Sequence, residues 1–189
     1  MKGLIHNEAE LEACVGKTPA AIHLKVIDHI DSSAQRWLET SPVAVIGVGH
    51  PGAAPITCLA GGAAGFATVV ESGQLQLPLS SLDKPEGVEA GMGFGSLFFS
   101  PGLGETLRIN GQVSAVADGV LTVAVAECFL HCAKALIRSA FWQGVSDPSD
   151  KPAGVASSPF AVVVTQHSNG SIDVSPKGDP AGELLEVNA

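Results

Sequence analysis

Apolar and polar positions along most of the chain follow the pattern of short β-strands separated by turn residues. From residue 41 to residue 130, β-rich apolar segments are bounded by Gly, Pro, Asn and Asp. The segments that we expect to be strands are 41–49, 65–72, 74–79, 95–100, 106–116 and 119–130. Asn110-Gly111 predicts a turn or a bulge inside the fifth segment. Six strands that are mostly adjacent in sequence favour an antiparallel barrel or sandwich.

Two segments follow a helical period instead. Residues 18–39 place apolar side chains on one face, with Thr18 as a candidate N-cap and Pro19 at the first helical position. Asp31 and the two serines after it could divide this segment into two helices, because such residues prefer caps. Residues 131–142, HCAKALIRSAFW, predict a further helix, whose apolar face holds positions 133, 136, 137, 140 and 141. The expected fold class is therefore mainly β, with flanking helices.

The C-terminal part of the chain repeats the beginning of the β region. Residues 157–182 read as a strand, a tight turn, a second strand and a loop rich in Gly and Pro. When the chain is shifted by 117 residues, 41–70 aligns with 158–187 without a gap, and nine of thirty positions are identical. In the first copy these positions are Ser41, Pro42, Ala44, Val45, His50, Gly61, Ala64, Gly65 and Val70. An internal repeat normally indicates a duplicated structural unit.

The repeat suggests a division of the chain into three parts. Residues 1–143 form a first unit, residues 144–156 a polar linker, and residues 157–189 the opening hairpin of a second, incomplete copy. One two-stranded hairpin cannot bury its own apolar face. We therefore expect either that the chain is a fragment of a longer protein, or that the hairpin docks on the first unit or on another subunit.

Composition narrows the possible partners and location. Apolar residues make up 46% of the 189 residues, enough for a sizeable core, and the formal net charge is −9. An acidic surface disfavours nucleic acid and anionic membranes as partners. The four cysteines are too sparse for a disulfide scaffold, and no apolar run reaches 18 residues. We expect a cytoplasmic protein with reduced thiols.

Differences between the two copies point to anion chemistry. Ser175-Pro176-Lys177-Gly178 in the second copy replaces Cys58-Leu59-Ala60-Gly61 in the first. A hydroxyl group and an ammonium group beside a Gly-rich loop can hold a phosphate, because the loop adds backbone N–H donors. The first copy keeps the loop but lacks the charge.

Further cationic side chains lie near the end of the first unit. His131, Lys134 and Arg138 have the i, i+3, i+7 spacing of one helical stripe, which is either an anion site or a solvated helix face. Arg108 lies between two apolar residues in a strand, so alternation places it on the opposite face, toward a cleft or toward solvent.

Two other kinds of site are disfavoured. Cys128, His131 and Cys132 include ligand types that zinc prefers, but no fourth ligand lies near them in sequence, and we expect no metal site. The glycine runs at 61–65 and 91–95 lack the spacing and the following helix of a dinucleotide-binding loop, so they predict turns.

Three motifs together resemble the pyridoxamine-5'-phosphate-oxidase-like FMN-binding split-barrel proteins, in particular a bacterial subgroup. The motifs are SPGLGETLRINGQ at 100–112, FLHCAKALIRSAFW at 129–142, and DVSPKGDPAG at 173–182. The resemblance covers most of residues 18–142 and again 157–187. It implies a six-stranded antiparallel split barrel, usually a homodimer, with FMN in a groove at the subunit or domain interface.

The resemblance also implies which residues hold the flavin. Its phosphate is typically bound by basic and hydroxyl side chains, and the matching positions here are Arg108, His131, Lys134, Arg138, Ser175 and Lys177. The expected function is that of a flavoprotein, an oxidoreductase whose small-molecule substrate and catalytic residues are unknown.

One segment departs from the family pattern. The subgroup usually carries an arginine-rich segment after the third strand, whereas this chain has PLSSLDKPEGVEAGMGFGS at 78–96, with Lys84 as its basic residue. The first unit would then be a degenerate copy. The alternative function is a catalytically inert split barrel used for dimerisation or docking, or a binder of another cofactor, such as haem or a deazaflavin.

Overall fold

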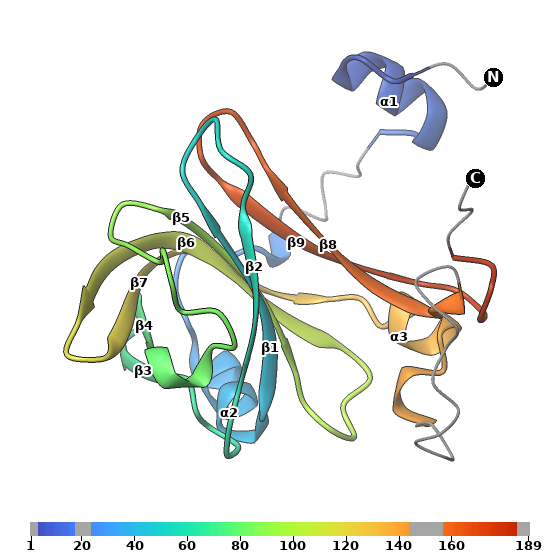
Figure 1. Ribbon diagram of the computed structural model, residues 1–189. Coiled ribbons are helices and arrows are strands. Elements are labelled where there is room, and N and C mark those ends of the chain that lie inside the picture. The colour runs from blue at the N-terminus through green and yellow to red at the C-terminus, as the bar shows by residue number, and fades with distance from the viewer. Residues whose placement is uncertain (1–3, 18–23, 144–156, 185–189) are drawn as a thin grey trace.

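The protein is mainly β, and most of its strands belong to one antiparallel sheet. The structure is a computed structural model that describes residues 4–17, 24–143 and 157–184. Seven strands form the sheet in the order β2-β1-β5-β6-β7-β4-β3, and a separate two-stranded sheet pairs β8 with β9 (Figure 1). The strands are β1 Val43–Gly49, β2 Ile56–Gly61, β3 Thr68–Glu71, β4 Gln74–Pro78, β5 Gly93–Phe99, β6 Thr106–Ala117, β7 Val120–His131, β8 Phe160–Gln166 and β9 Ile172–Gly178.

All six predicted strands are present, and the sheet has one more. The additional strand is β2, which only the alignment with the C-terminal hairpin indicates. Asn110-Gly111 is a bulge, since the β6–β7 register shifts between these two residues.

The helices differ more from the sequence-based prediction. They are α1 Glu8–Val15, α2 Ser32–Thr40 and α3 Lys134–Arg138, with short 3-10 turns η2 Leu79–Ser81 and η3 Phe141–Gln143. The prediction of a helix over 18–39 is wrong for residues 26–31, where Ile27 instead forms a β-bridge with Cys128, and residues 24 and 25 form only a 3-10 turn. Its second half is α2, which begins where Asp31 Oδ1 accepts hydrogen bonds from the backbone N–H groups of Ser33 and Ala34. The proposed cap at Thr18 and Pro19 lies outside the described residues, and α1 was not predicted.

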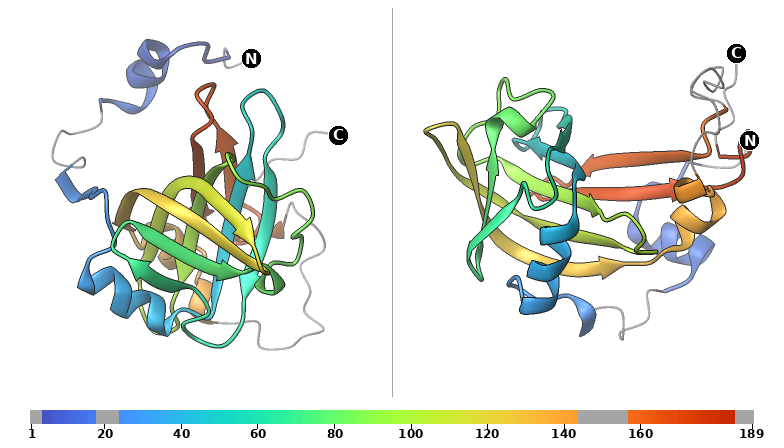
Figure 2. Two further views of the ribbon diagram at one scale, coloured as in Figure 1. Left: turned by 90° about the vertical axis from the view of Figure 1, so that its left-hand side faces the viewer. Right: turned by 90° about the horizontal axis from the view of Figure 1, so that it is seen from below.

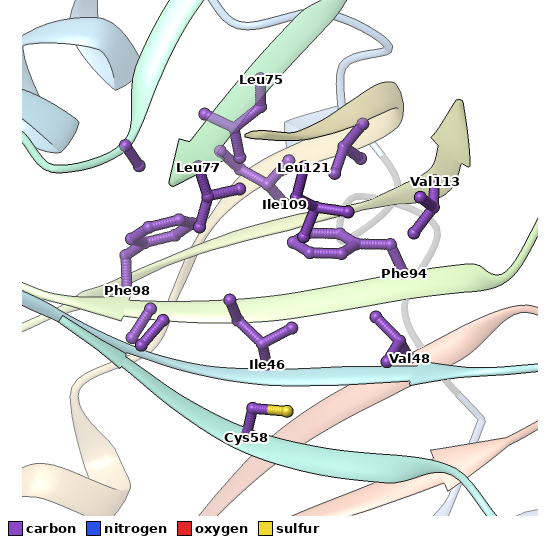
Figure 3. Close-up of a cluster of buried hydrophobic side chains, with 14 of the residues drawn as sticks. Ile46, Val48, Cys58, Leu75, Leu77, Phe94, Phe98, Ile109, Val113 and Leu121 are labelled. Carbon is purple, nitrogen blue, oxygen red and sulfur yellow. The ribbon is translucent and has the colours of Figure 1, made fainter. Parts of the chain in front are cut away.

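The main core lies on the concave face of the curled sheet. Alternate residues of β1, β5, β6 and β7 point into it together with β4 and α2, as Figure 3 shows for Ile46, Phe94, Phe98 and Leu77. After β4 the chain returns to β2, where Leu82 forms an isolated bridge with Ala60. The two ends of the sheet thus approach each other, although within the described strands the ladder is not closed.

The β8–β9 hairpin packs on the opposite, convex face of β1 and β5. Figure 2 shows it as a second layer beside the sheet. A second apolar cluster joins Val45 and Leu97 of the sheet to Ile172 and Val174 of β9 and to Leu136 of α3. We expected the hairpin to dock either on the first unit or on another subunit, and in the structure it docks on the first unit. None of the described helices is long and apolar enough to span a membrane.

Candidate functional site

The end of β9 meets α3, so that the end of the first unit and the end of the second hairpin form one groove. Gly178 permits this contact, because a Cβ atom there would collide with the backbone carbonyl of Ala135. The groove between them is a cavity of about 370 Å³. Its lining residues are His131, Cys132, Lys134, Ala135, Arg138, Ala161, Val163, Pro176, Lys177, Gly178, Asp179 and Leu184.

Four of the six predicted site residues line this groove, from two distant parts of the sequence. His131, Lys134 and Arg138 come from the first unit, and Lys177 comes from the second hairpin. Ser175 lies beside them, because the Lys177 ammonium group donates a hydrogen bond of 3.2 Å to the Ser175 hydroxyl. Ser175 and Lys177 share a face of β9, as their spacing of two requires.

The groove is basic and open to solvent. Lys134 and Lys177 are exposed, and Arg138 has a side chain that is 60% exposed. Asp179 at the rim lies 3.9 Å from the Arg138 guanidinium, too far for a strong hydrogen bond, so Arg138 keeps donors available. These three cations in an otherwise acidic protein produce a local field that favours an anion.

His131 does not belong to the helix that we predicted. It is the last residue of β7, and α3 begins only at Lys134, so the expected helical stripe is wrong. Ile137, assigned to the apolar helix face, is 72% exposed. Burial above all, together with the nearby positive charges of Arg108 and Lys25, lowers the pKa of His131 to about 4. At neutral pH its imidazole is therefore uncharged and contributes hydrogen bonds rather than charge.

Arg108 lies outside the groove and already has partners. It points to the convex face, as alternation predicts, but β9 covers it and leaves it only 6% exposed. Its guanidinium donates to the Asp173 carboxylate at 2.5 Å and to the backbone carbonyl of Val174, and it lies over the ring of Phe129. It faces neither a cleft nor solvent: it connects β6 to β9.

The corresponding positions in the first copy are inside the core. Cys58 and Ala60 are both buried, and burial raises the pKa of the Cys58 thiol. Neither can reach an anion at the surface. Of the two equivalent segments, 58–61 and 175–178, only the second therefore carries an accessible cation, Lys177.

Sequence reasoning missed two participants. Asp179 and Leu184 line the groove, and only Asp179 had a signal in the sequence, since it belongs to the DVSPKGDPAG motif. Asp173, the first residue of the DVSPKGDPAG motif, lies in β9 and pairs with Arg108.

A larger cavity lies at the tip of the β8–β9 hairpin, but its chemistry differs. It has a volume of about 980 Å³ and includes Glu127, Asp173 and Asn110. Its described lining residues include two carboxylates and neither Lys nor Arg. An anion is thus better accommodated by the smaller groove.

Comparison with known proteins identifies no relative: neither a family model, nor a curated protein, nor a solved structure matches this chain.

Proposed function

We propose that this protein binds FMN, with the flavin phosphate in the groove between α3 and β9, and that its sheet is of the split-barrel type. The observation that carries the proposal is the meeting of Lys134 and Arg138 with Lys177, which lies about 40 residues later in the sequence. The resemblance of the motifs to FMN-binding split barrels supplies the identity of the anion. The bridge between Ala60 and Leu82 supports the split-barrel form, because it brings the ends of the sheet together.

The residues present fit a phosphate group. Lys134, Arg138 and Lys177 supply charge-assisted donors, and the Ser175 hydroxyl and neutral His131 supply further hydrogen bonds. When bound, the flavin would supply the redox chemistry, and this chain would hold and orient it. Apolar groove residues such as Val163 and Pro176 offer a surface on which part of the cofactor can rest.

The test is a titration of the purified chain with FMN, followed by flavin fluorescence, for the unaltered protein and for Lys177→Ala. Losing a hydrogen bond to a charged group costs about 1.5–3 kcal/mol, so we expect FMN affinity to fall roughly 10- to 100-fold. Arg138→Ala should have a similar effect. Inorganic phosphate should compete, and riboflavin, which lacks the phosphate, should bind weakly to both proteins.

Lys84→Ala is the matched control, because it removes a lysine of the first copy that does not line the groove. It should leave FMN affinity unchanged. A protein that takes up no FMN, or an FMN affinity that does not change in Lys177→Ala, would contradict the proposal.

The buried Cys58 and Ala60 favour a second candidate function for the first unit. In this alternative, the first unit is an inert module that serves for dimerisation or docking, and the cofactor, if any, belongs to another class, such as haem or a deazaflavin. An absorbance spectrum of the protein after incubation with each cofactor separates these cases.

A further inference from the structure

The two hairpins of the repeat have the same strand register. In the first hairpin, β1–β2, Val43 pairs with Gly61 and Gly47 pairs with Thr57. Adding 117 to each number gives the pairs of the second hairpin, β8–β9, for every position of the β1–β2 ladder. The second hairpin is thus a structural repeat of the first.

Equivalent residues of the two hairpins face each other. A Cβ atom on Gly47 would lie 2.5 Å from Val164, and one on Gly49 would lie 3.0 Å from the Gln166 side chain; in each pair the numbers differ by 117. The turns also meet, since Gly170 contacts Pro51, and Figures 1 and 2 both show the two hairpin tips side by side. Contacts between equivalent residues are the mark of an isologous interface. An approximate two-fold axis therefore runs along β1 and β8.

This axis accounts for the position of β9 and leaves a matching position vacant. β9, the equivalent of β2, lies over β5, where Gly95 contacts Ile172 and Val174. The same rotation places an equivalent of β5 over the convex face of β2. None of the described residues covers this face: Leu59 is 55% exposed, and Thr57 is also exposed. On β9 the equivalent residues, Pro176 and Val174, are buried.

We infer that the convex face of β2, with Val43 of β1, is a docking surface for a partner unit that repeats β5, β6 and α3 of this chain. The surface continues the interface that β8–β9 already forms. The partner binds by this face and not by strand pairing, because the free edge of β2 is bonded to Asp83: the backbone N–H of Leu59 donates to its carboxylate, and the Asp83 N–H donates to the Leu59 carbonyl.

The pairings of the second hairpin specify the partner's contacts. Phe160 packs against Phe99 and Phe141, so Val43, its equivalent, would meet the partner's counterparts of these two rings. A second copy of this chain, folded as described, cannot be the occupant, because its own β9 already covers its β5 and α3. The partner unit must therefore carry this surface uncovered.

The test extends the whole chain by a second copy of residues 73–143, joined after Ala189 because Ala189 is the equivalent of Ser72. The thiol of Leu59→Cys is then labelled with a thiol reagent. The background carries Cys14→Ser and, in both copies, Cys132→Ser. We expect labelling in the extended chain to be at least tenfold slower than in the unextended chain. Val70→Cys, at another exposed position, is the control and should be labelled equally fast in both chains. Leu97→Asp with Phe99→Asp in the appended copy alone should restore fast labelling of the Leu59→Cys thiol.

A second measurement uses the position in β2 that corresponds to Asp173, the ion-pair partner of Arg108. Ile56 is the equivalent of Asp173, so Ile56→Asp gives the appended copy's Arg108 a carboxylate partner. The loss of melting temperature caused by Ile56→Asp should be smaller in the extended chain. Equal labelling or equal losses in both chains, or an appended copy that stays unfolded, would overturn the inference. So would protection in the unextended chain that rises with its concentration, because the occupant would then be a second copy.

Discussion

At the scale of single residues, strand alternation determines the face of the sheet on which Arg108 lies, and packing of β9 determines what its side chain binds. Its side chain lies on the convex face because Leu107 and Ile109 occupy the core. Once β9 covers it, the Asp173 carboxylate and the Val174 carbonyl replace the water that it loses. We therefore regard Arg108 as a positioning residue that fixes β9, and with it Lys177, opposite α3.

Asp173→Asn tests this pairing. The substitution leaves a buried guanidinium without its counter-charge, and we expect the free energy of unfolding to fall by about 1–3 kcal/mol. The lower part of the range is favoured, since the Asp173 side chain is 48% exposed. Urea denaturation measures the change. Asp179→Asn is the matched control, because its pair with Arg138 is long and exposed, and a loss as large as that of Asp173→Asn would contradict the argument.

His131 makes a residue-level prediction about pH. Its pKa of about 4 in the folded protein lies below the value near 6.5 expected in the unfolded chain, so the unfolded state binds more protons between these values. Stability is thus retained above about pH 6.5 and is lost as the pH falls toward 4. In His131→Gln this loss between pH 7 and pH 4.5 should be smaller, as measured by denaturant unfolding at both values. An equal loss in both proteins would show that His131 is not responsible.

At the scale of elements, glycines allow the second hairpin to lie directly on the sheet. A Cβ atom on Gly93 would collide with the backbone carbonyl of Gly170, and neither backbone can move aside easily. The segment after β7 shows a different effect at this scale. The pattern of residues 131–142 is helical, but pairing with Thr106 keeps His131 in the sheet, and α3 forms only afterwards.

Gly93→Ala should therefore separate the hairpin from β5. We expect the free energy of unfolding to fall by about 1–3 kcal/mol, as for other overpacked sites. Hydrogen exchange of the β8–β9 amides should become faster than in the unaltered protein. Gly104→Ala, where a Cβ atom meets nothing within 4 Å, should change neither quantity. Unchanged exchange in Gly93→Ala would contradict the packing described here.

At the scale of the whole molecule, the groove depends on contact between the first unit and the second hairpin. The β region of the first unit supplies the surface on which the second hairpin rests, and the hairpin in turn carries Lys177 to α3. This arrangement joins the two copies around the approximate two-fold axis. The proposed homodimer, the FMN and the cytoplasmic location remain predictions.

The sequence by itself determined the strands, the bulge at Asn110, the repeat, and the set of cationic residues that gather in the groove, because these follow from local period, turn chemistry and the comparison of the two copies. It did not determine that His131 belongs to a strand and is uncharged, or that Arg108 is buried under β9. Only the tertiary structure decided these. His131 is held in the sheet by pairing with Thr106 and is desolvated there, and the partners of Arg108 lie more than 60 residues away in sequence. The same holds for the uncovered face of β2, which becomes apparent only when the two hairpins are seen face to face.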